Sequence, residues 1–291
     1  MRRAFEPSAG LESSVAACGL AGGLALALGE GGIEVHFQPI SSTLSRKVTG
    51  AEALVRWRRA DGTLVLPSEF VAAAEGAGLS RVLTNSVLEL SLRQLRTWSS
   101  AGHALHLAVN TTVADLLDAE FPREVARALA ATGLAPGTLV LEVTESSVMT
   151  DPLRIGQVLA ELGSLGVELS LDDFGTGYSS LTHLRELPVC EVKIDRSFVT
   201  GMRDDPTDAA IVYAMIGLAH KLGIRVVAEG VEDEETWEAL RELGCELIQG
   251  YVISRPVAAA ELERQLLTGK EPRRLGRVCA GASALGPARA V

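Results

Sequence analysis

The sequence predicts an α/β protein built as a modified (β/α)8 TIM-like barrel whose first strand is antiparallel to its neighbour. Three observations lead to this fold class. Eight short apolar runs recur between residues 33 and 251, and patterns of helical spacing separate most of them. Strands that alternate with helices form parallel βα units. Eight strands in a chain of 291 residues suit a closed barrel better than an open doubly wound sheet.

The first half of the barrel begins with two strands, at residues 35–40 and 48–57. A Ser/Thr-rich turn and no helix joins them, which is why we expect the first strand to be antiparallel. Helical patterns follow at residues 67–79 and 80–100, and in the second Leu88, Leu92 and Leu95 recur at helical spacing. A strand at residues 105–110 precedes a helical stretch that ends near Gly133. A strand at residues 139–144 precedes a helix with an apolar face between residues 155 and 165.

The second half begins with a strand from residue 167 that ends in two adjacent carboxylates, Asp172 and Asp173. A loop with Gly175 and Gly177 follows, and then a short helix to residue 187. Strands at residues 190–194, 225–228 and 247–251 alternate with helices at 207–222, 234–243 and a last one that ends at residue 267. An Asp-Asp pair by itself is also typical of a solvated turn with an Asp N-cap. Whether the Asp-Asp pair is functional or only part of a turn therefore depends on the residues at the other strand ends.

The composition, with 47% hydrophobic and 22% charged residues, is that of a soluble globular chain. A net charge of -10 argues against binding nucleic acid polymers, which requires a basic surface. The four cysteines are far apart and indicate reduced thiols in a cytoplasmic protein. The apolar run at residues 15–29 is too short to span a bilayer, and we interpret it as a helix or linker rather than an export signal. We therefore divide the chain into an N-terminal helix or linker (1–32), a barrel (33–267) and a flexible C-terminal tail (268–291).

Polar side chains lie within or just after seven of the eight predicted strands. The carboxyl ends of barrel strands meet on one face, and enzymes with this fold keep their active sites there. Parallel strands are otherwise apolar, and unpaired buried carboxylates are costly, so stability alone explains this pattern poorly. Each residue taken singly could still be a satisfied structural group. The strand-end residues are Glu52, Asn110, Glu142, Glu145, Asp172, Asp173, Lys193, Glu229 and Gln249.

The chemistry of this set indicates a hard divalent cation. Carboxylates and one amide, without clustered His or Cys, are the ligands that Mg²⁺ and Mn²⁺ prefer. Two such ions would suit cleavage of a phosphoester, since one activates a water and both neutralise the phosphate oxygens. Lys193 could stabilise the charge that develops during the reaction, or it could simply balance the neighbouring Asp residues.

The motifs that carry these residues resemble those of the EAL domain family of bacterial cyclic di-GMP phosphodiesterases. The resemblance extends in order from about residue 33 to residue 267. Eight motifs carry it: Phe37-Gln-Pro-Ile40, Ala51-Glu-Ala-Leu-Val-Arg-Trp57, Asn110-Thr-Thr112, Glu142-Val-Thr-Glu145, Leu171-Asp-Asp-Phe-Gly-Thr-Gly-Tyr-Ser-Ser-Leu181, Lys193-Ile-Asp-Arg-Ser-Phe198, Ala228-Glu-Gly-Val-Glu232 and Gln249-Gly-Tyr251. Eight motifs in series make the resemblance specific.

The resemblance implies a barrel that hydrolyses cyclic di-GMP to linear pGpG with two Mg²⁺ or Mn²⁺ ions. It implies metal ligation by Glu52, Asn110, Glu142, Asp172 and Asp173. Lys193 would contact the catalytic water, with Glu229 and Asp173 assisting at the second metal. The residues implied in substrate binding are Gln38, Leu54, Arg56 and Gln249.

Glu145 matches a glutamate that anchors the loop from Asp173 to Leu181, and the resemblance implies a homodimer formed through that loop region. The alternative function is a non-hydrolysing EAL module that binds the dinucleotide or a protein partner. A phosphosugar-processing barrel is a weaker alternative, because no Gly-rich phosphate-binding loop follows the last two strands. The intact set of ligand positions favours the enzyme, and we predict an active phosphodiesterase.

Overall fold

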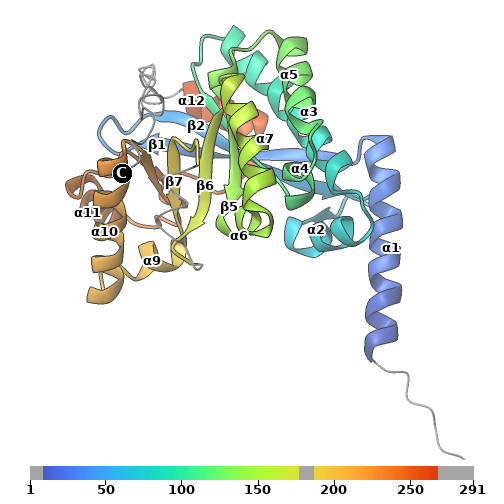
Figure 1. Cartoon of the computed structure of the whole chain (residues 1–291), viewed down its shortest axis with the longest axis horizontal. Coiled ribbons are helices and arrows are strands. Elements are labelled where there is room, and N and C mark those ends of the chain that lie inside the picture. Colours follow the sequence, from blue (N-terminus) through green and yellow to red (C-terminus); the bar gives the residue numbers. More distant parts are fainter. Residues whose placement is uncertain (1–8, 177–186, 268–291) are drawn as a thin grey trace, which may run out of the picture.

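The computed structural model describes residues 9–176 and 187–267, and all the strands in this part of the chain belong to one ten-stranded sheet (Figure 1). Its strands are β1 (Ile33–Ser42), β2 (Val48–Arg58), β3 (Leu64–Val65), β4 (His106–Asn110), β5 (Leu139–Thr144), β6 (Glu168–Phe174), β7 (Glu191–Ile194), β8 (Arg225–Ala228), β9 (Leu247–Gln249) and β10 (Val257–Ala258). The α-helices are α1 (Ala9–Glu30), α2 (Pro67–Gly76), α3 (Ser80–Ser100), α4 (Val113–Leu116), α5 (Phe121–Thr132), α6 (Glu145–Thr150), α7 (Pro152–Ser164), α9 (Arg196–Gly201), α10 (Pro206–Leu222), α11 (Glu234–Glu242) and α12 (Ala259–Leu267).

Eight of these strands close into a barrel. The order runs β1-β9-β8-β7-β6-β5-β4-β2, and β1 pairs again with β2 to complete the ring. β1 is antiparallel to both of its barrel neighbours, whereas the pairs from β2 round to β9 are parallel. The predicted modified (β/α)8 TIM-like barrel with an antiparallel first strand is therefore confirmed. The short strands β3 and β10 extend the sheet beyond the ring and were not anticipated.

Local sequence signals fix where the helices begin and end. Asp233 caps α11 through a hydrogen bond from the backbone N–H of Thr236, and the acidic first turn suits the positive end of the helix dipole. A proline at its first turn starts α5, and Gly133 ends it in the left-handed conformation with φ of 65°. The strands between the helices are β-branched and aliphatic runs, and those of the parallel wall are buried on both faces.

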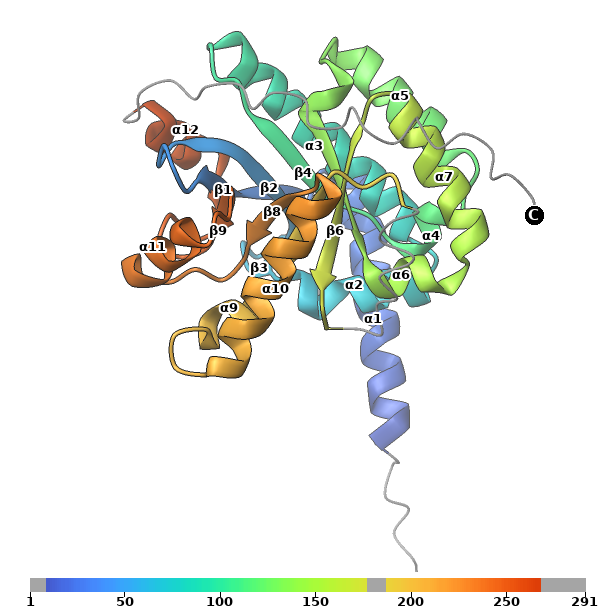
Figure 2. The ribbon, with the colours of Figure 1, turned by 60° about the vertical axis from the view of Figure 1, so that its left-hand side comes forward.

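The barrel wall and the inner faces of the helices share one large hydrophobic core. In Figures 1 and 2 the helices α3, α5 and α7 cover one side of the sheet, and α10 and α11 cover another. Trp98 of α3 is fully buried and packs edge-on against Phe37 of β1, with ring centroids 4.8 Å apart. This packing holds the antiparallel strand β1 against the helix α3.

The helix α1 leaves the barrel on one side and extends past it, as both ribbon views show. Its last turns pack on a second, smaller core that includes Trp57 and Phe70. Leu24 and Ala27 are the buried helix residues there, while Leu26 on the opposite face is 65% exposed. Within the described residues, no helix has the length and apolar character needed to cross a membrane.

The amino-terminal ends of β6, β7 and β8 carry a buried ionic group, which we call the floor cluster: Glu168, Glu191 and Arg225. The guanidinium Nη2 of Arg225 lies 2.5 Å from Glu168 Oε2 and 3.2 Å from Glu191 Oε2, and all three side chains are less than 10% exposed. His106 lies beside the cluster, with Nδ1 4.0 Å from Glu168 Oε2. Charged groups at this end of a barrel contribute to stability rather than to chemistry.

Candidate active site

The carboxyl ends of the strands carry a second ionic cluster with one lysine at its centre. Lys193 of β7 is 1% exposed. Its Nζ lies 2.6 Å from Glu229 Oε1 and 2.8 Å from Glu142 Oε1. Asp172 Oδ1 at 3.5 Å and Glu52 Oε2 at 3.7 Å complete the group. Four carboxylates from four parts of the barrel therefore surround one ammonium group, and we call these five residues the mouth cluster.

Two amide side chains join the mouth cluster through Glu52. Asn110 Nδ2, at the end of β4, donates to Glu52 Oε1 at 2.8 Å. Gln249 Nε2, at the end of β9, donates to Glu52 Oε2 at 2.6 Å and also lies 3.1 Å from Gln38 Oε1. Each oxygen of Glu52 thus accepts a hydrogen bond, which helps to fix the carboxylate although it is almost completely buried.

The parallel register explains why these residues converge. Asn110 pairs with Glu142 across β4 and β5, and Thr144 pairs with Asp172 across β5 and β6. Side chains that alternate along β2 bring Glu52, Leu54 and Arg56 to the same face, with Arg56 furthest along the strand. The facing residue of β1 opposite Glu52 is Gln38. The four predicted substrate residues therefore lie along β1, β2 and the end of β9, next to the mouth cluster.

A bulge places the two adjacent aspartates differently. Leu171 pairs with Val192 and Phe174 with Ile194, so Asp172 and Asp173 together face the single residue Lys193. Asp173 has φ of 55°, in the left-handed region that few non-glycine residues adopt, and its backbone N–H donates to Asp172 Oδ1 at 3.0 Å. The two carboxylates consequently need not alternate as on a regular strand, and Asp173 is the more exposed of the two.

Electrostatics in the mouth cluster are strongly perturbed. Burial would lower the pKa of Lys193, but the four surrounding carboxylates outweigh burial and raise the pKa well above its usual value. Burial and the charge of Glu52 raise the pKa of Glu142. Burial also raises the pKa of Glu229, to about 7, with Asp172 and Glu52 adding to the effect against the opposing charge of Lys193. The cluster holds more negative charge than one ammonium can balance.

The donor set suits a hard divalent cation. Glu142 is 1% exposed, yet neither of its carboxylate oxygens accepts a well-aligned hydrogen bond among the described residues, and the same is true of Gln249 Oε1. Carboxylate and amide oxygens are the ligands that Mg²⁺ and Mn²⁺ take. As the side chains stand, no three His, Cys, Asp or Glu of residues 9–176 and 187–267 are arranged around one ion. The cation that the carboxylates surround is the ammonium group of Lys193.

Glu145 begins α6 and is buried, and its Oε2 has no hydrogen-bond partner within the described residues. The loop that this glutamate is expected to anchor runs from Asp173 to Leu181, and residues 177–181 lie outside the part that the structure describes. The anchoring role and the dimer contact through this loop therefore stay predictions.

Two features near the mouth escaped the sequence reasoning. Thr111 donates through both its backbone N–H and its hydroxyl to the carbonyl oxygen of Glu142, at 3.0 and 2.7 Å. Tyr251 is 47% exposed, and the guanidinium of Arg255 lies 4.1 Å from its ring centroid. A hydroxyl directly after a strand-end amide was the available signal for Thr111. No sequence spacing indicated the pairing of Tyr251 with Arg255.

A groove of about 360 Å³ lies elsewhere, on the outer wall between α3 and α5. Its charged residues are already paired on the surface: Arg93 pairs with Glu89 within α3, and the partly buried Glu124 pairs with Arg127 of α5 and with Arg81 of α3. The concentration of buried, perturbed charge lies instead in the mouth cluster, and perturbed ionisable groups gather at functional sites. We therefore place the candidate active site at the barrel mouth.

The fold and the mouth cluster together define a class: a closed α/β barrel with buried carboxylates and one lysine at the carboxyl ends of its strands. Comparison with known proteins narrows this class. The family model described as "EAL domain" matches residues 23–256. The chain belongs to the EAL domain family.

Several relatives and solved structures are similar to this chain. Cyclic di-GMP phosphodiesterase NbdA of Pseudomonas aeruginosa is 44% identical over 241 residues, which are 82% of this chain and 31% of the relative. Bifunctional diguanylate cyclase/cyclic di-GMP phosphodiesterase MucR of the same organism is 41% identical over 229 residues, 78% of this chain and 33% of the relative. The chain thus spans about a third of the length of these relatives.

Among solved structures, the PaMucR phosphodiesterase in complex with c-di-GMP has a TM-score of 0.80 at 40% identity, covering 84% of this chain and 99% of that one. The EAL enzyme Bd1971, in a form with cAMP and cyclic di-GMP bound, has a TM-score of 0.82 at 29% identity, covering 87% of this chain and 70% of that one. Both likenesses cover more than four fifths of this chain.

Proposed function

We propose that the chain is a metal-dependent phosphodiesterase that hydrolyses cyclic di-GMP to linear pGpG. The observation that carries this proposal is the mouth cluster, in which Lys193 lies within 4 Å of four carboxylates, three on the separate strands β2, β5 and β6 and one directly after β8. Membership of the EAL domain family supports it, as do the relatives named as cyclic di-GMP phosphodiesterases. The same activity implies a cytoplasmic protein that lowers the level of a bacterial second messenger.

Two Mg²⁺ or Mn²⁺ ions are proposed as cofactors. Glu52, Asn110, Glu142 and Asp172 would hold the first, and Asp173 with Glu229 would hold the second. When bound, such ions lower the pKa of a water and neutralise charge on the phosphodiester. The support in this chain is the excess of buried carboxylate charge and the oxygen atoms of Glu142 and Gln249 that lack aligned hydrogen bonds.

Lys193 has an electrostatic role in this proposal. Because its pKa is raised, it carries a proton at neutral pH and cannot accept another from water. The ammonium group can instead donate a hydrogen bond to the attacking oxygen and stabilise negative charge that develops in the transition state. Burial of Lys193 keeps bulk water from weakening that interaction.

The substrate would lie along the mouth beside β1 and β2. Arg56 donates from Nη1 to the carbonyl oxygen of Val55 at 2.8 Å and makes no ion pair within residues 9–176 and 187–267, so its guanidinium is available to contact a phosphate or a guanine. Leu54 would line the pocket, and Gln38 and Gln249 would bind near the cations. Association of two chains through the region from Asp173 to Leu181, and the division into residues 1–32, 33–267 and 268–291, remain part of this proposal.

Product analysis tests the proposal. Purified protein is incubated with cyclic di-GMP and either Mg²⁺ or Mn²⁺, and the nucleotides are separated by chromatography. Formation of pGpG that a chelator prevents is the expected result. The matched variant is Glu142→Gln, which keeps the volume of the side chain and removes its charge. Tight binding of cyclic di-GMP without turnover in either metal would reject the enzyme and support the alternative, a non-hydrolysing receptor.

A further inference from the structure

The segment that follows Asn110 is fixed by several hydrogen bonds to other parts of the barrel. Asn110 ends β4, and its amide is fixed to Glu52. Thr111 is tied to the carbonyl oxygen of Glu142 by two hydrogen bonds, as described above. The position of Asn110 relative to Glu52 and Glu142 therefore depends on how residues 111 and 112 are held.

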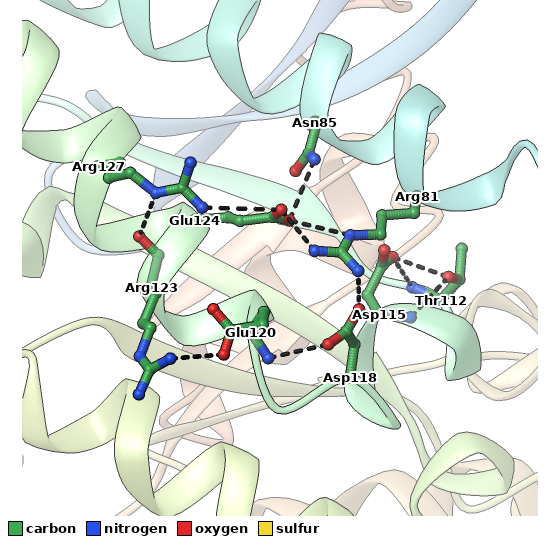
Figure 3. A network of polar contacts seen from close by, with 9 residues as sticks. All are labelled: Arg81, Asn85, Thr112, Asp115, Asp118, Glu120, Arg123, Glu124 and Arg127. Atoms are coloured by element: carbon green, nitrogen blue, oxygen red, sulfur yellow. Dashed lines mark hydrogen bonds and ion pairs between the residues drawn. The ribbon is translucent and has the colours of Figure 1, made fainter.

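Thr112 is held by a reciprocal pair of contacts at the start of α4. Its hydroxyl accepts from the backbone N–H of Asp115 at 3.3 Å and donates to Asp115 Oδ2 at 2.7 Å. Asp115 Oδ2 also accepts from the backbone N–H of Thr112 at 2.9 Å. This arrangement is a capping box for a helix of only four residues (Figure 3).

Asp115 is an unusual capping residue because it is completely buried. The hydroxyl of Thr84, on the long helix α3, donates to the same Oδ2 at 2.8 Å, and Oδ1 has no hydrogen-bond partner in the described part of the chain. A buried carboxylate is costly, and an exposed one would cap the short helix equally well. Its burial makes sense if the carboxylate has to connect α3 with the segment after β4.

Arg81, which lies one turn before Thr84 on α3, makes ion pairs on the side of Asp115 that faces the solvent (Figure 3). Its guanidinium contacts Asp118 and makes a two-pronged ion pair with Glu124 of α5, at 2.5 and 3.2 Å. Asn85 donates to the same Glu124 at 3.1 Å. Arg81 and Asn85 therefore join α3 to α5, and Asp115 is hydrogen-bonded to α3 through Thr84.

We propose that Asp115 is a positioning residue, which together with Thr84 sets the place of Asn110 in the metal site. This inference rests on the function proposed above. The chain of contacts runs from Thr84 Oγ1 to Asp115, from Asp115 to Thr112, and along the backbone to Asn110. Partners that orient a metal ligand from behind commonly change metal affinity by about 10- to 100-fold when removed.

The test measures Mn²⁺ binding by electron paramagnetic resonance of the free ion, which requires no turnover. Thr84→Val keeps the shape of the side chain and removes the hydroxyl, whereas Thr84→Ser keeps the hydroxyl and removes the methyl group. Thr97→Val is the matched control, because Thr97 lies exposed on the same helix and donates within it to the carbonyl oxygen of Arg93. We expect Thr84→Val to weaken Mn²⁺ binding roughly tenfold, and the other two variants to bind like the unchanged protein.

A background without the ligand separates positioning from general destabilisation. In Asn110→Ala protein, Thr84→Val should cause no further loss of Mn²⁺ affinity, because its effect passes through Asn110. Thr112→Val, which removes the hydroxyl that donates to Asp115 Oδ2, replaces Thr84→Val if that variant does not fold.

Unchanged Mn²⁺ affinity in Thr84→Val, or an equal loss in Thr84→Ser, would overturn the positioning role and leave the proposed function standing. A full further loss in the Asn110→Ala background would overturn it as well. Absence of Mn²⁺ binding in the unchanged protein would instead overturn the proposed function and this inference together.

Discussion

Replacement of Lys193 by methionine tests the electrostatic description of the mouth cluster. Methionine keeps most of the length of the side chain but removes the ammonium group that lies 2.6 to 3.7 Å from four carboxylate oxygens. At an effective dielectric constant near 20, one such pair at 4 Å is worth about 4 kcal/mol before the cost of burial. Measured losses for removing one partner of a buried ion pair are about 3–5 kcal/mol. We expect a loss of that size in the free energy of unfolding of the metal-free protein.

The assay is urea unfolding followed by circular dichroism at mildly alkaline pH, with a chelator and then with Mn²⁺. Lys221→Met is the control, because Lys221 is exposed on α10 and its replacement should change stability by less than about 0.5 kcal/mol. Mn²⁺ should stabilise Lys193→Met more than the unchanged protein, because the cation neutralises carboxylates that have lost the ammonium group. For scale, a ligand that binds only the folded state adds about 2.7 kcal/mol to the free energy of unfolding at 100 times its dissociation constant. A loss below about 1 kcal/mol in the chelator, or equal stabilisation of both proteins by Mn²⁺, would refute this reasoning.

Three further predictions concern the rest of the barrel. Arg225→Met leaves the two glutamates of the floor cluster buried without a cation, so it should lower the free energy of unfolding in urea by about 3–5 kcal/mol. The control Arg241→Met removes an exposed ion pair and should lower it by less than about 1 kcal/mol. Equal losses in the two variants would contradict the burial argument. Gly250→Ala should abolish turnover, because the added carbon would lie 2.1 Å from a backbone oxygen of the loop after β8, while Gly217→Ala meets open space and should behave normally in the same assay. Burial lowers the pKa of His106 below the ordinary histidine value of about 6.5, so the folded protein favours the neutral form and loses stability as pH falls below about 6.5. His106→Gln should flatten that part of the curve of unfolding free energy against pH, and an unchanged slope would show that another group is responsible.

The acid sensitivity of His106 depends on its charged neighbours. Glu168 and Glu191 face it and favour the proton, while Arg225 disfavours it, and burial is the largest effect. The arginine and the two glutamates remain paired with one another, so the net shift is downward. The contribution of His106 to the free energy of unfolding is therefore present at neutral pH and is lost when the pH falls, not when it rises.

Much of the fold could be predicted because its signals are local. Apolar runs of strand length, helical spacing between them and a turn without a helix after residue 40 were enough for the closed barrel and for the antiparallel first strand. Strand ends were less certain: β9 ends at Gln249, two residues before the predicted end, because Gly250 approaches the backbone of Val231. The strands β3 and β10 contain two residues each, too few for any periodicity to show.

The mouth cluster could be predicted in its members but not in its geometry. The rule that parallel strand ends share one face brought Glu52, Glu142, Asp172 and Glu229 together, and the structure places all four around Lys193. That the lysine is the centre of the group, rather than one member of a ring, depends on side-chain lengths and on barrel curvature. The bulge at residues 172 and 173 and the burial of Asp115 likewise follow from packing across strands that sequence spacing does not encode.

Manganese-edge anomalous diffraction from crystals soaked with Mn²⁺ and cyclic di-GMP is the most direct measurement of the central claim. We predict anomalous peaks bonded to oxygens of Glu52, Asn110, Glu142 and Asp172, with Lys193 displaced from the middle of the carboxylates and turned toward the phosphodiester. Bound nucleotide with no anomalous peak at the mouth, and with Lys193 still paired to the four carboxylates, would contradict the account.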